Sequence, residues 1–154
     1  MRIPEGLFKI TKEVLRHVLR RPVVGISAVA QTESGQILLI RRSDTGMWAL
    51  PGGTVEWGET LQETLPRELW EEAGVKHVEP GKLVGVYSAP GRDPRFHAIS
   101  VVVMARIRAP LGQPSNPAEI LEAALFDPED LPKELSHGNK EMLENALGDR
   151  LVWE

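Results

Sequence analysis

The sequence predicts an α/β fold in which a mixed β-sheet lies between helices. Two observations predict it. Segments rich in β-branched apolar residues alternate with segments of helical spacing, and turn residues join most of the strand-like segments. The chain has 154 residues and shows no internal repeat, linker or low-complexity tract. It therefore fits one domain, residues 1–154, which is large enough to bury a core.

Composition narrows the class of protein. Hydrophobic residues make up 42% and charged residues 26% of the chain, as in ordinary soluble globular proteins. The formal net charge of -4 argues against a mainly electrostatic nucleic-acid binder. A nucleotide site remains compatible, because a bound metal supplies positive charge locally. There is no cysteine, no signal-peptide pattern and no stretch of about 18 uncharged apolar residues. We expect a cytoplasmic protein that does not associate with membranes.

An amphipathic helix is predicted from residue 7 to residue 21, as an N-terminal extension over residues 1–22 that ends at Pro22. Its apolar residues recur at helical spacing and basic residues fall between them. A basic amphipathic helix suits a membrane surface or an acidic partner. We favour packing on its own domain or on a second subunit of a homodimer, since the apolar stripe is ordinary for a packed helix.

Residues 23–31 and 36–42 are predicted to form the two strands of a hairpin, joined by a turn that contains Gly35. Arg41 and Arg42 close the second strand. Adjacent strand residues point to opposite faces, so only one of them can face a site. Beyond a loop at residues 43–46, Trp48 is expected to pack into the core.

The next helix is delimited by its own end signals. Thr60 is a good N-cap, Glu63 completes a capping box, and Gly74 ends a helix that runs to Ala73. Pro66 lies inside this helix, where it removes a backbone donor, so we expect a kink or a locally widened turn. The predicted buried stripe is Leu61, Leu65 and Leu69.

Three carboxylates share one face of that helix. Glu68, Glu71 and Glu72 are related as i, i+3 and i+4, and they repel one another unless cations lie among them. Magnesium prefers oxygen ligands and is often held by carboxylates together with substrate phosphates. The alternative is a solvated acidic face, which is the commoner explanation of glutamate-rich helices.

The second half of the chain continues the alternation. We predict strands at residues 75–78 and 82–88, separated by a turn at 79–81, then a loop at 89–96 and a long strand at 97–108. An irregular connection at 110–117, a short strand at 123–126 and a final helix at 138–147 complete the fold.

Residues 53–75 resemble the signature box of the Nudix hydrolases. The pattern is Gly53, five residues, Glu59, seven residues, then Arg67-Glu68-Leu69-x-Glu71-Glu72-x-Gly74-Val75, and it matches every fixed position of that box. The resemblance implies the Nudix-type α/β/α sandwich and hydrolysis of a diphosphate linkage with Mg²⁺, for which Mn²⁺ is a substitute. It implies Glu68 and Glu72 as the main metal ligands, with Glu71 as a further ligand.

The resemblance also implies roles for residues around the box. The carbonyl of Gly52 is expected to be a metal ligand, and Arg67 to orient the glutamates by pairing with Glu59. Arg42 holds the position of a basic residue that follows the apolar strand in many family members. Arg42 is expected either to contact a phosphate or to form a surface ion pair.

The general base is expected outside the box, on a later loop. Glu119 and Glu122 are the candidates because they precede the 126–127 segment in a proline-bounded region, although both would equally suit exposed loop charges. His97 is a third candidate. The remaining histidines are expected at the surface: His17, His77 and His137.

Substrate choice depends on the loop Gly91-Arg92-Asp93-Pro94-Arg95. It resembles the equivalent segment of pyrophosphatases that act on ADP-ribose and nucleotide sugars, so Arg92 or Arg95 is expected to reach a phosphate or ribose. Alternatively, an Asp93–Arg95 pair stiffens a turn. Other readings are a house-cleaning nucleoside triphosphate pyrophosphohydrolase and a non-catalytic nucleotide sensor. Because every acidic box position is present, the sensor is disfavoured, and an RNA substrate is disfavoured by the acidic balance.

Overall fold

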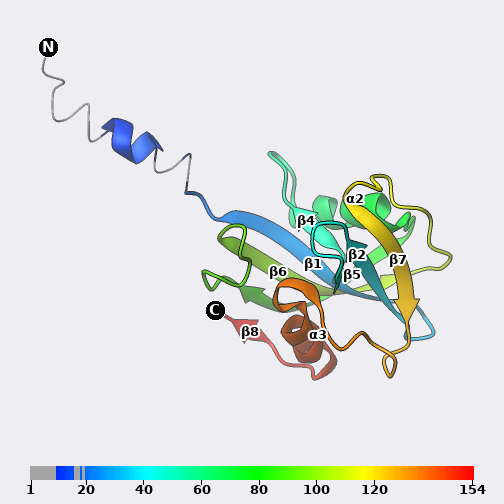
Figure 1. The fold of residues 1–154 in the computed structure, drawn as a ribbon. Helices are drawn as coiled ribbons and strands as arrows, with labels where there is room; N and C mark the ends of the chain where they lie inside the picture. Colours follow the sequence, from blue (N-terminus) through cyan, green and yellow to red (C-terminus); the bar gives the residue numbers. More distant parts are fainter. Residues whose placement is uncertain (1–9, 16–17, 19) are drawn as a thin grey trace, which may run out of the picture.

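The computed structural model describes residues 10–15, 18 and 20–154 (Figure 1). Residues 10–15 are helical, and Ile10, Val14, Leu15 and Val18 are exposed. The described part of the N-terminal apolar stripe is thus not buried on the chain's own domain. The other positions of the predicted helix before residue 20, namely 7–9, 16–17 and 19, lie outside the described residues. No helix in the described ranges is long and apolar enough to cross a membrane.

Within residues 20–154, eight strands form one mixed sheet. The central strand β1 pairs in parallel with β6 along its whole length and in antiparallel fashion with β4. The predicted hairpin forms, but β1 and β2 are paired only beside the turn, where Gln31 faces Ile37. Beyond that point β2 pairs with β3 and β7. The strands are β1 (Val23–Gln31), β2 (Ile37–Arg42), β3 (Trp48–Ala49), β4 (Gly52–Thr54), β5 (Val78–Tyr87), β6 (Ala98–Ile107), β7 (Ile120–Phe126) and β8 (Val152–Trp153).

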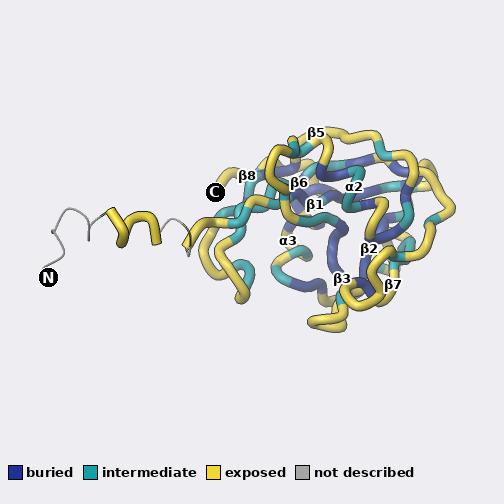
Figure 2. Tube along the Cα trace, turned by 90° about the horizontal axis from the view of Figure 1, so that it is seen from above, coloured by how far each residue is buried: buried dark blue, intermediate teal, exposed yellow. Residues whose placement is uncertain are grey.

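Helices cover both faces of the sheet. Helix α2 (Leu61–Ala73) packs on one face, where Leu65 and Leu69 join a buried cluster with Leu38. Helix α3 (Asn139–Leu147), preceded by the short 3-10 helix η1 (Ser136–Gly138), packs on the other face. Because β2 is buried on both sides, its apolar residues 37–40 are continuous instead of alternating with polar ones. Figure 2 shows the buried strands enclosed by more exposed segments. The predicted α/β/α sandwich is confirmed.

The end signals of α2 function as predicted. Thr60 Oγ1 accepts a hydrogen bond from the Glu63 N–H, and the Glu63 carboxylate accepts one from the Thr60 N–H. Gly74 adopts the left-handed conformation, with φ of 61°, that favours glycine at a helix C-terminus. The distortion expected at Pro66 does not interrupt the helix, which is continuous from Leu61 to Ala73. The three glutamates therefore keep their common face.

Three features differ from the sequence predictions. One strand, β5, replaces the two predicted around the 79–81 turn, because bulges between Pro80 and Gly85 let the chain stay paired with β6. Strand β7 begins at Ile120, three residues earlier than predicted, and so contains Glu122. The short strand β8 was not predicted. It pairs in parallel with β5 and brings the C-terminal residue Glu154 to the loop after β5.

Candidate active site

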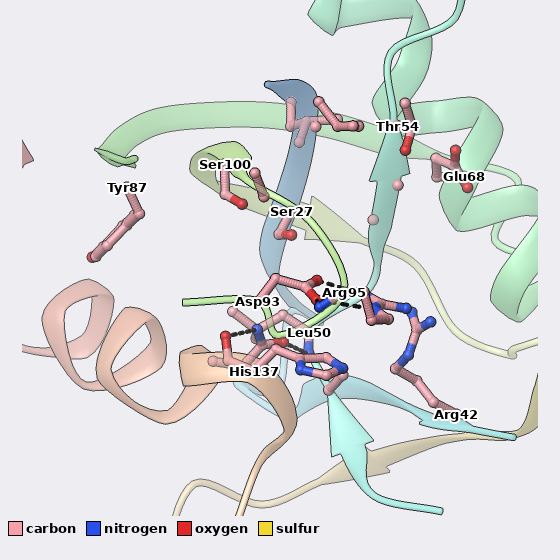
Figure 3. Close-up of a pocket in the computed structure, with 18 of the residues that line it drawn as sticks. Ser27, Arg42, Leu50, Thr54, Glu68, Tyr87, Asp93, Arg95, Ser100 and His137 are labelled. Atoms are coloured by element: carbon pink, nitrogen blue, oxygen red, sulfur yellow. Dashed lines mark hydrogen bonds and ion pairs between the residues drawn. The ribbon is translucent and has the colours of Figure 1, made fainter. Parts of the chain in front are cut away.

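A cleft of about 510 Å³ lies between α2, the strands β1 and β4, and the loop at residues 88–97 (Figure 3). It gathers residues that are far apart in the chain. Most of the residues singled out from the sequence line it: Arg42, Gly52, Arg67, Glu68, Glu71, Arg92, Arg95 and Glu119.

Arg67 organises the α2 side of the cleft. Its Nε donates to Glu59 Oε1 at 2.7 Å and its Nη2 to Glu59 Oε2 at 2.9 Å, a bidentate pair. Nη1 donates to Glu68 at 2.9 Å and to Glu71 at 3.4 Å, and Nη2 also reaches the carbonyl of Thr54. The hydrogen bonds from Arg67 are the main reason that the pKa of Glu59 falls to about 2. The predicted pairing of Arg67 with Glu59 is present.

Glu68 lies against the glycine turn that precedes the helix. A Cβ on Gly53 would stand 2.2 Å from Glu68 Oε1, so no other residue fits there without moving the carboxylate. Burial raises the pKa of Glu68, and the neighbouring Arg67 opposes that rise. The glycine turn thus permits a carboxylate to approach the backbone of β4 closely.

Glu72 is the most buried of the three carboxylates, with 6% of the residue exposed, and it lines an adjoining pocket with Glu68, Glu71 and Glu119 instead of the cleft itself. Its Oε2 accepts a hydrogen bond from the Gly52 N–H at 2.8 Å. Desolvation raises its pKa well above the ordinary value, and the negative charges of Glu68 and Glu119 add to that rise. Gly52 has φ of 147°, and a Cβ there would stand 2.1 Å from the Ile26 carbonyl oxygen. The backbone donor of Glu72 therefore depends on glycine at this position.

The carboxylates of α2 have the donor chemistry that suits a divalent cation. A buried carboxylate is costly unless a cation or several donors compensate it, and Glu72 forms no ion pair within the described part of the chain. Carboxylate oxygens are the ligands that magnesium prefers. No three Asp, Glu or His side chains among the described residues are already gathered closely enough to hold a metal. The reason is visible in the contacts: Arg67 holds Glu68 and Glu71, while Glu72 turns to the Gly52 N–H.

Arg42 and Arg95 form another side of the cleft, and both are paired with aspartates. Arg42, at the end of β2, makes a bidentate pair with Asp44 at 3.0 and 2.9 Å. Arg95, on the loop after β5, makes a bidentate pair with Asp93 at 2.9 and 2.7 Å and also donates to Asp44 at 2.9 Å. The Asp93–Arg95 pair weighed as a turn stiffener is present, and Arg95 still lines the cleft. Arg41, on the opposite face of β2, does not line it.

Arg92 is held by other elements. Its guanidinium pairs with Glu154 at the C-terminus and with Glu141 on α3, and it lies 4.9 Å from the centroid of the Tyr87 ring. Arg92 lines the cleft, and its donors, like those of Arg95, are directed at two carboxylates. The structure thus gives Arg92 a role in fastening the C-terminus that the sequence did not indicate.

The structure separates the candidates for the general base. Glu119 lines the cleft and its charge raises the pKa of both Glu68 and Glu72. Glu122 points away and forms an ion pair with Arg41 at 3.6 Å, since strand β7 pairs these two positions. Of the two alternatives left open for Glu122, its position outside the cleft agrees with the exposed charge. His97 Nε2 is bonded to the Ser88 carbonyl at 2.8 Å and does not line the cleft.

The other histidines divide similarly. His77 is exposed, as predicted, and His17 lies outside the described residues. His137 was expected at the surface, but it lines the cleft, and its Nε2 is buried without a partner in the described part of the chain. It has a positive φ of 51°, because the chain turns there from η1 into α3.

Several residues that shape the site were missed from the sequence. Thr64 Oγ1 donates to Glu59 at 2.9 Å, and Asn139 Oδ1 accepts from the Leu50 N–H at 2.7 Å. Thr64 had a usable signal, because it lies one helical turn after the N-cap and faces the same way as Glu68. Asn139 and Glu154 had none, since their partners lie in other elements. Asp44 lies two residues after Arg42, so that pair could be read from the sequence, whereas its contact with Arg95 could not.

Comparison with known proteins agrees with this geometry. Residues 20–146 match the NUDIX domain model. The chain is 40% identical over 116 residues to an ADP-ribose pyrophosphatase of Methanocaldococcus jannaschii, covering 73% of this chain and 66% of that protein, slightly less than two thirds of its length.

Two solved structures are similar in fold. A MutT NUDIX hydrolase from Burkholderia pseudomallei is 29% identical, with a TM-score of 0.69, covering 82% of this chain and 98% of that one. An ADP-ribose pyrophosphatase from Streptococcus suis is 26% identical, with a TM-score of 0.70, covering 87% and 100%. The matched domain includes the glycine turn, the acidic helix and both sides of the cleft, and the chain belongs to the Nudix family.

Proposed function

We propose that this protein hydrolyses the diphosphate linkage of a nucleoside diphosphate derivative, ADP-ribose or a related nucleotide sugar, with the help of a divalent metal ion. The observation that carries the proposal is one cleft with carboxylates on the α2 side and the guanidinium groups of Arg42 and Arg95 on another. A cleft of that kind suits a diphosphate, which needs cations around its oxygens and carboxylates to hold a metal.

Nudix hydrolases generally use divalent metal ions, and the residues here that would hold one are Glu68, Glu72, Glu71 and the carbonyl of Gly52. We propose Mg²⁺, with Mn²⁺ as a substitute. A bound divalent cation neutralises phosphate charge, polarises phosphorus and lowers the pKa of a water molecule.

The chain's own residues contribute positioning and proton transfer. Arg67 holds Glu59, Glu68 and Glu71 in one network, so it orients the carboxylates instead of touching the substrate. Glu119 is proposed as the general base, which accepts the proton of the attacking water. The new P–O bond forms to the water oxygen as the bridging P–O bond breaks, and ADP-ribose yields AMP and ribose 5-phosphate.

The substrate assignment is supported from two directions. The M. jannaschii and S. suis proteins are named ADP-ribose pyrophosphatases. Phe96 lines the cleft and is 40% exposed, so its ring is available to the flat face of a nucleobase.

A substrate panel tests the proposal. The purified protein is assayed with Mg²⁺ against ADP-ribose, other nucleotide sugars, dinucleoside polyphosphates and nucleoside triphosphates, and the products are identified. We expect the highest kcat/KM with ADP-ribose or a nucleotide sugar. A strong preference for triphosphates would replace this substrate class, and nucleotide binding without turnover would make the domain a sensor.

A further inference from the structure

Asp44 holds arginines from two separate segments of the chain. Its carboxylate accepts from Nε and Nη2 of Arg42, which ends β2, and from Nη1 of Arg95, on the loop after β5. Arg42 and Arg95 line the cleft, whereas Asp44 does not. The carboxylate therefore lies outside the cleft lining and joins the two guanidinium groups. Figure 3 shows Arg42 and Arg95 side by side at the cleft.

The backbone fixes Asp44 in that position. The Arg42 N–H donates to the Met47 carbonyl at 3.0 Å, and the Gly46 N–H donates to the Arg42 carbonyl at 2.9 Å, which closes a tight turn around Asp44. Gly46 has φ of 68°, a conformation that favours glycine. Ser43 fastens the same turn to the segment that carries the candidate base, because its N–H donates to the Glu119 carbonyl at 2.9 Å.

The turn places a permanent negative charge beside the phosphate-facing cations. The hydrogen bonds from Arg42 are the main reason that the pKa of Asp44 falls to about 2, so this carboxylate is ionised at all working pH values. Asp93 balances Arg95 in a second bidentate pair. Two arginines thus face two aspartates, and the net positive charge offered to a ligand by these four residues is close to zero.

We propose that Asp44 is a specificity-determining residue, whose shared carboxylate limits how many negative charges this cleft accepts. The inference rests on the proposed function, since it concerns the same cleft and names what selects among its substrates. A diphosphate diester such as ADP-ribose carries fewer charges than a nucleoside triphosphate. With Asp44 present, the positive charge of Arg42 and Arg95 is sufficient to balance ADP-ribose. The larger negative charge of a triphosphate outweighs it.

Coulomb's law sets the size of the effect. One unit charge about 7 Å from a ligand charge, in a solvent-exposed setting, changes affinity by about threefold for each additional unit of ligand charge. As free anions ATP carries about two more negative charges than ADP-ribose, and Mg²⁺ bound to ATP reduces that difference, so removing the Asp44 charge should improve ATP relative to ADP-ribose by at most about tenfold. Since the effect is one of charge, it should weaken as salt is raised.

The test compares KM for ATP and for ADP-ribose in the full chain with Mg²⁺, for the wild type and for Asp44→Asn, Asp44→Ser and Asp44→Glu. Both neutral variants should lower the ratio KM(ATP)/KM(ADP-ribose) by about threefold to tenfold, with the kcat ratio nearly unchanged and with a smaller shift at high salt. Asp44→Glu, which keeps the charge, should keep the wild-type ratio. Asp130→Asn is the matched control, because Asp130 is exposed and lines none of the cleft.

An unchanged ratio in both neutral variants, or an equal shift in Asp44→Glu, would overturn the inference.

A binding measurement separates the inference from the proposed function. Calorimetry with α,β-methylene-ATP and α,β-methylene-ADP in the presence of Mg²⁺ needs no turnover. If the wild type hydrolyses nothing but Asp44→Asn still favours the triphosphate analogue, the inference stands and the proposed function fails. If the wild type turns over ADP-ribose and the variants show no shift, the proposed function stands and the inference fails. Binding of neither analogue would overturn the inference as well.

Discussion

The helix side and the loop side of the cleft hold their charges in different ways. On α2, Arg67 reaches Glu59, Glu68 and Glu71, all within eight residues of it in sequence. On the loops, Arg42–Asp44 and Arg95–Asp93 are two residues apart, but Arg95 also reaches Asp44 across 51 residues and Arg92 reaches Glu154 across 62. The Arg67 network on the helix side therefore depends only on contacts that are local in sequence. The loop side depends on the completed fold and on half-exposed ion pairs, which makes it the more adjustable of the two.

This contrast predicts that substitutions on the two sides change different properties of the protein. Changes on the helix side should abolish chemistry, because its carboxylates are the ones placed to hold a metal. Changes on the loop side should alter substrate affinity or stability and leave the chemical step largely intact.

The largest effect is expected for Glu72→Gln. Loss of a buried carboxylate that is proposed to hold the metal should remove several kcal/mol of transition-state stabilisation, so kcat should fall by about a thousandfold or more. The amide keeps an acceptor for the Gly52 N–H, so the thermal unfolding midpoint should stay near that of the wild type. Steady-state kinetics at saturating Mg²⁺ checks this, and normal rates would remove Glu72 from the site.

Glu119→Gln and Glu122→Gln form a matched pair for the general base. Glu119 lines the cleft whereas Glu122 pairs with Arg41 on the outside. Loss of a general base costs about 100-fold or more in kcat, so we expect that loss only for Glu119→Gln. The acidic limb of its pH–rate profile should also disappear. Equal rates for the two variants would show that the base lies elsewhere.

Arg95→Ala and Arg92→Ala test the division within the loop side. Arg95→Ala should raise KM for ADP-ribose by about tenfold, the loss of a charged hydrogen bond to phosphate. Arg92→Ala should leave KM within about twofold but destabilise the protein by about 1 kcal/mol, because its exposed ion pairs and ring contact are individually weak. Kinetics and chemical unfolding measured side by side decide this. A large KM effect from Arg92→Ala would return it to the substrate-binding residues.

The smallest effect concerns pH. The folded-state pKa of Glu59 is about 2, below its ordinary value of 4.5. A depressed carboxyl pKa contributes stability that is present above pH 4.5 and is lost as pH falls toward 2. The unfolding midpoint of the wild type should therefore drop over that window more steeply than that of Glu59→Gln. Parallel curves for the two proteins would show that the Arg67–Glu59 pair adds nothing to stability.

The sequence predicted the helix side well and the loop side only in part, for the same physical reason. The capping box and the glycine end of α2 depend on residues close together in the chain, so spacing alone indicates them, and the Nudix resemblance implied the Arg67–Glu59 pair. Arg42 and Arg95 were identified as arginines near a site, but their shared partner Asp44 was not, because only the finished sheet brings those loops together.

The differences have similar origins. Glu122 stayed a candidate for the site because the start of β7 was predicted three residues late, which hid its pairing with Arg41. His137 was assigned to the surface because nothing local shows that η1 turns its chain into the cleft. The C-terminal strand β8 is two residues long, too short to give a periodic signal, yet it delivers Glu154 to Arg92.

The central claim is that this cleft cleaves a diphosphate with a divalent metal, and phosphorus NMR tests it most directly. ADP-ribose is mixed with the wild-type protein or with Glu72→Gln, each with Mg²⁺ and with excess EDTA. We predict that the diphosphate signals give way to two monophosphate signals, AMP and ribose 5-phosphate, only with the wild type and Mg²⁺. Diphosphate signals that persist with Mg²⁺, or that disappear equally fast with EDTA or in Glu72→Gln, would contradict the account.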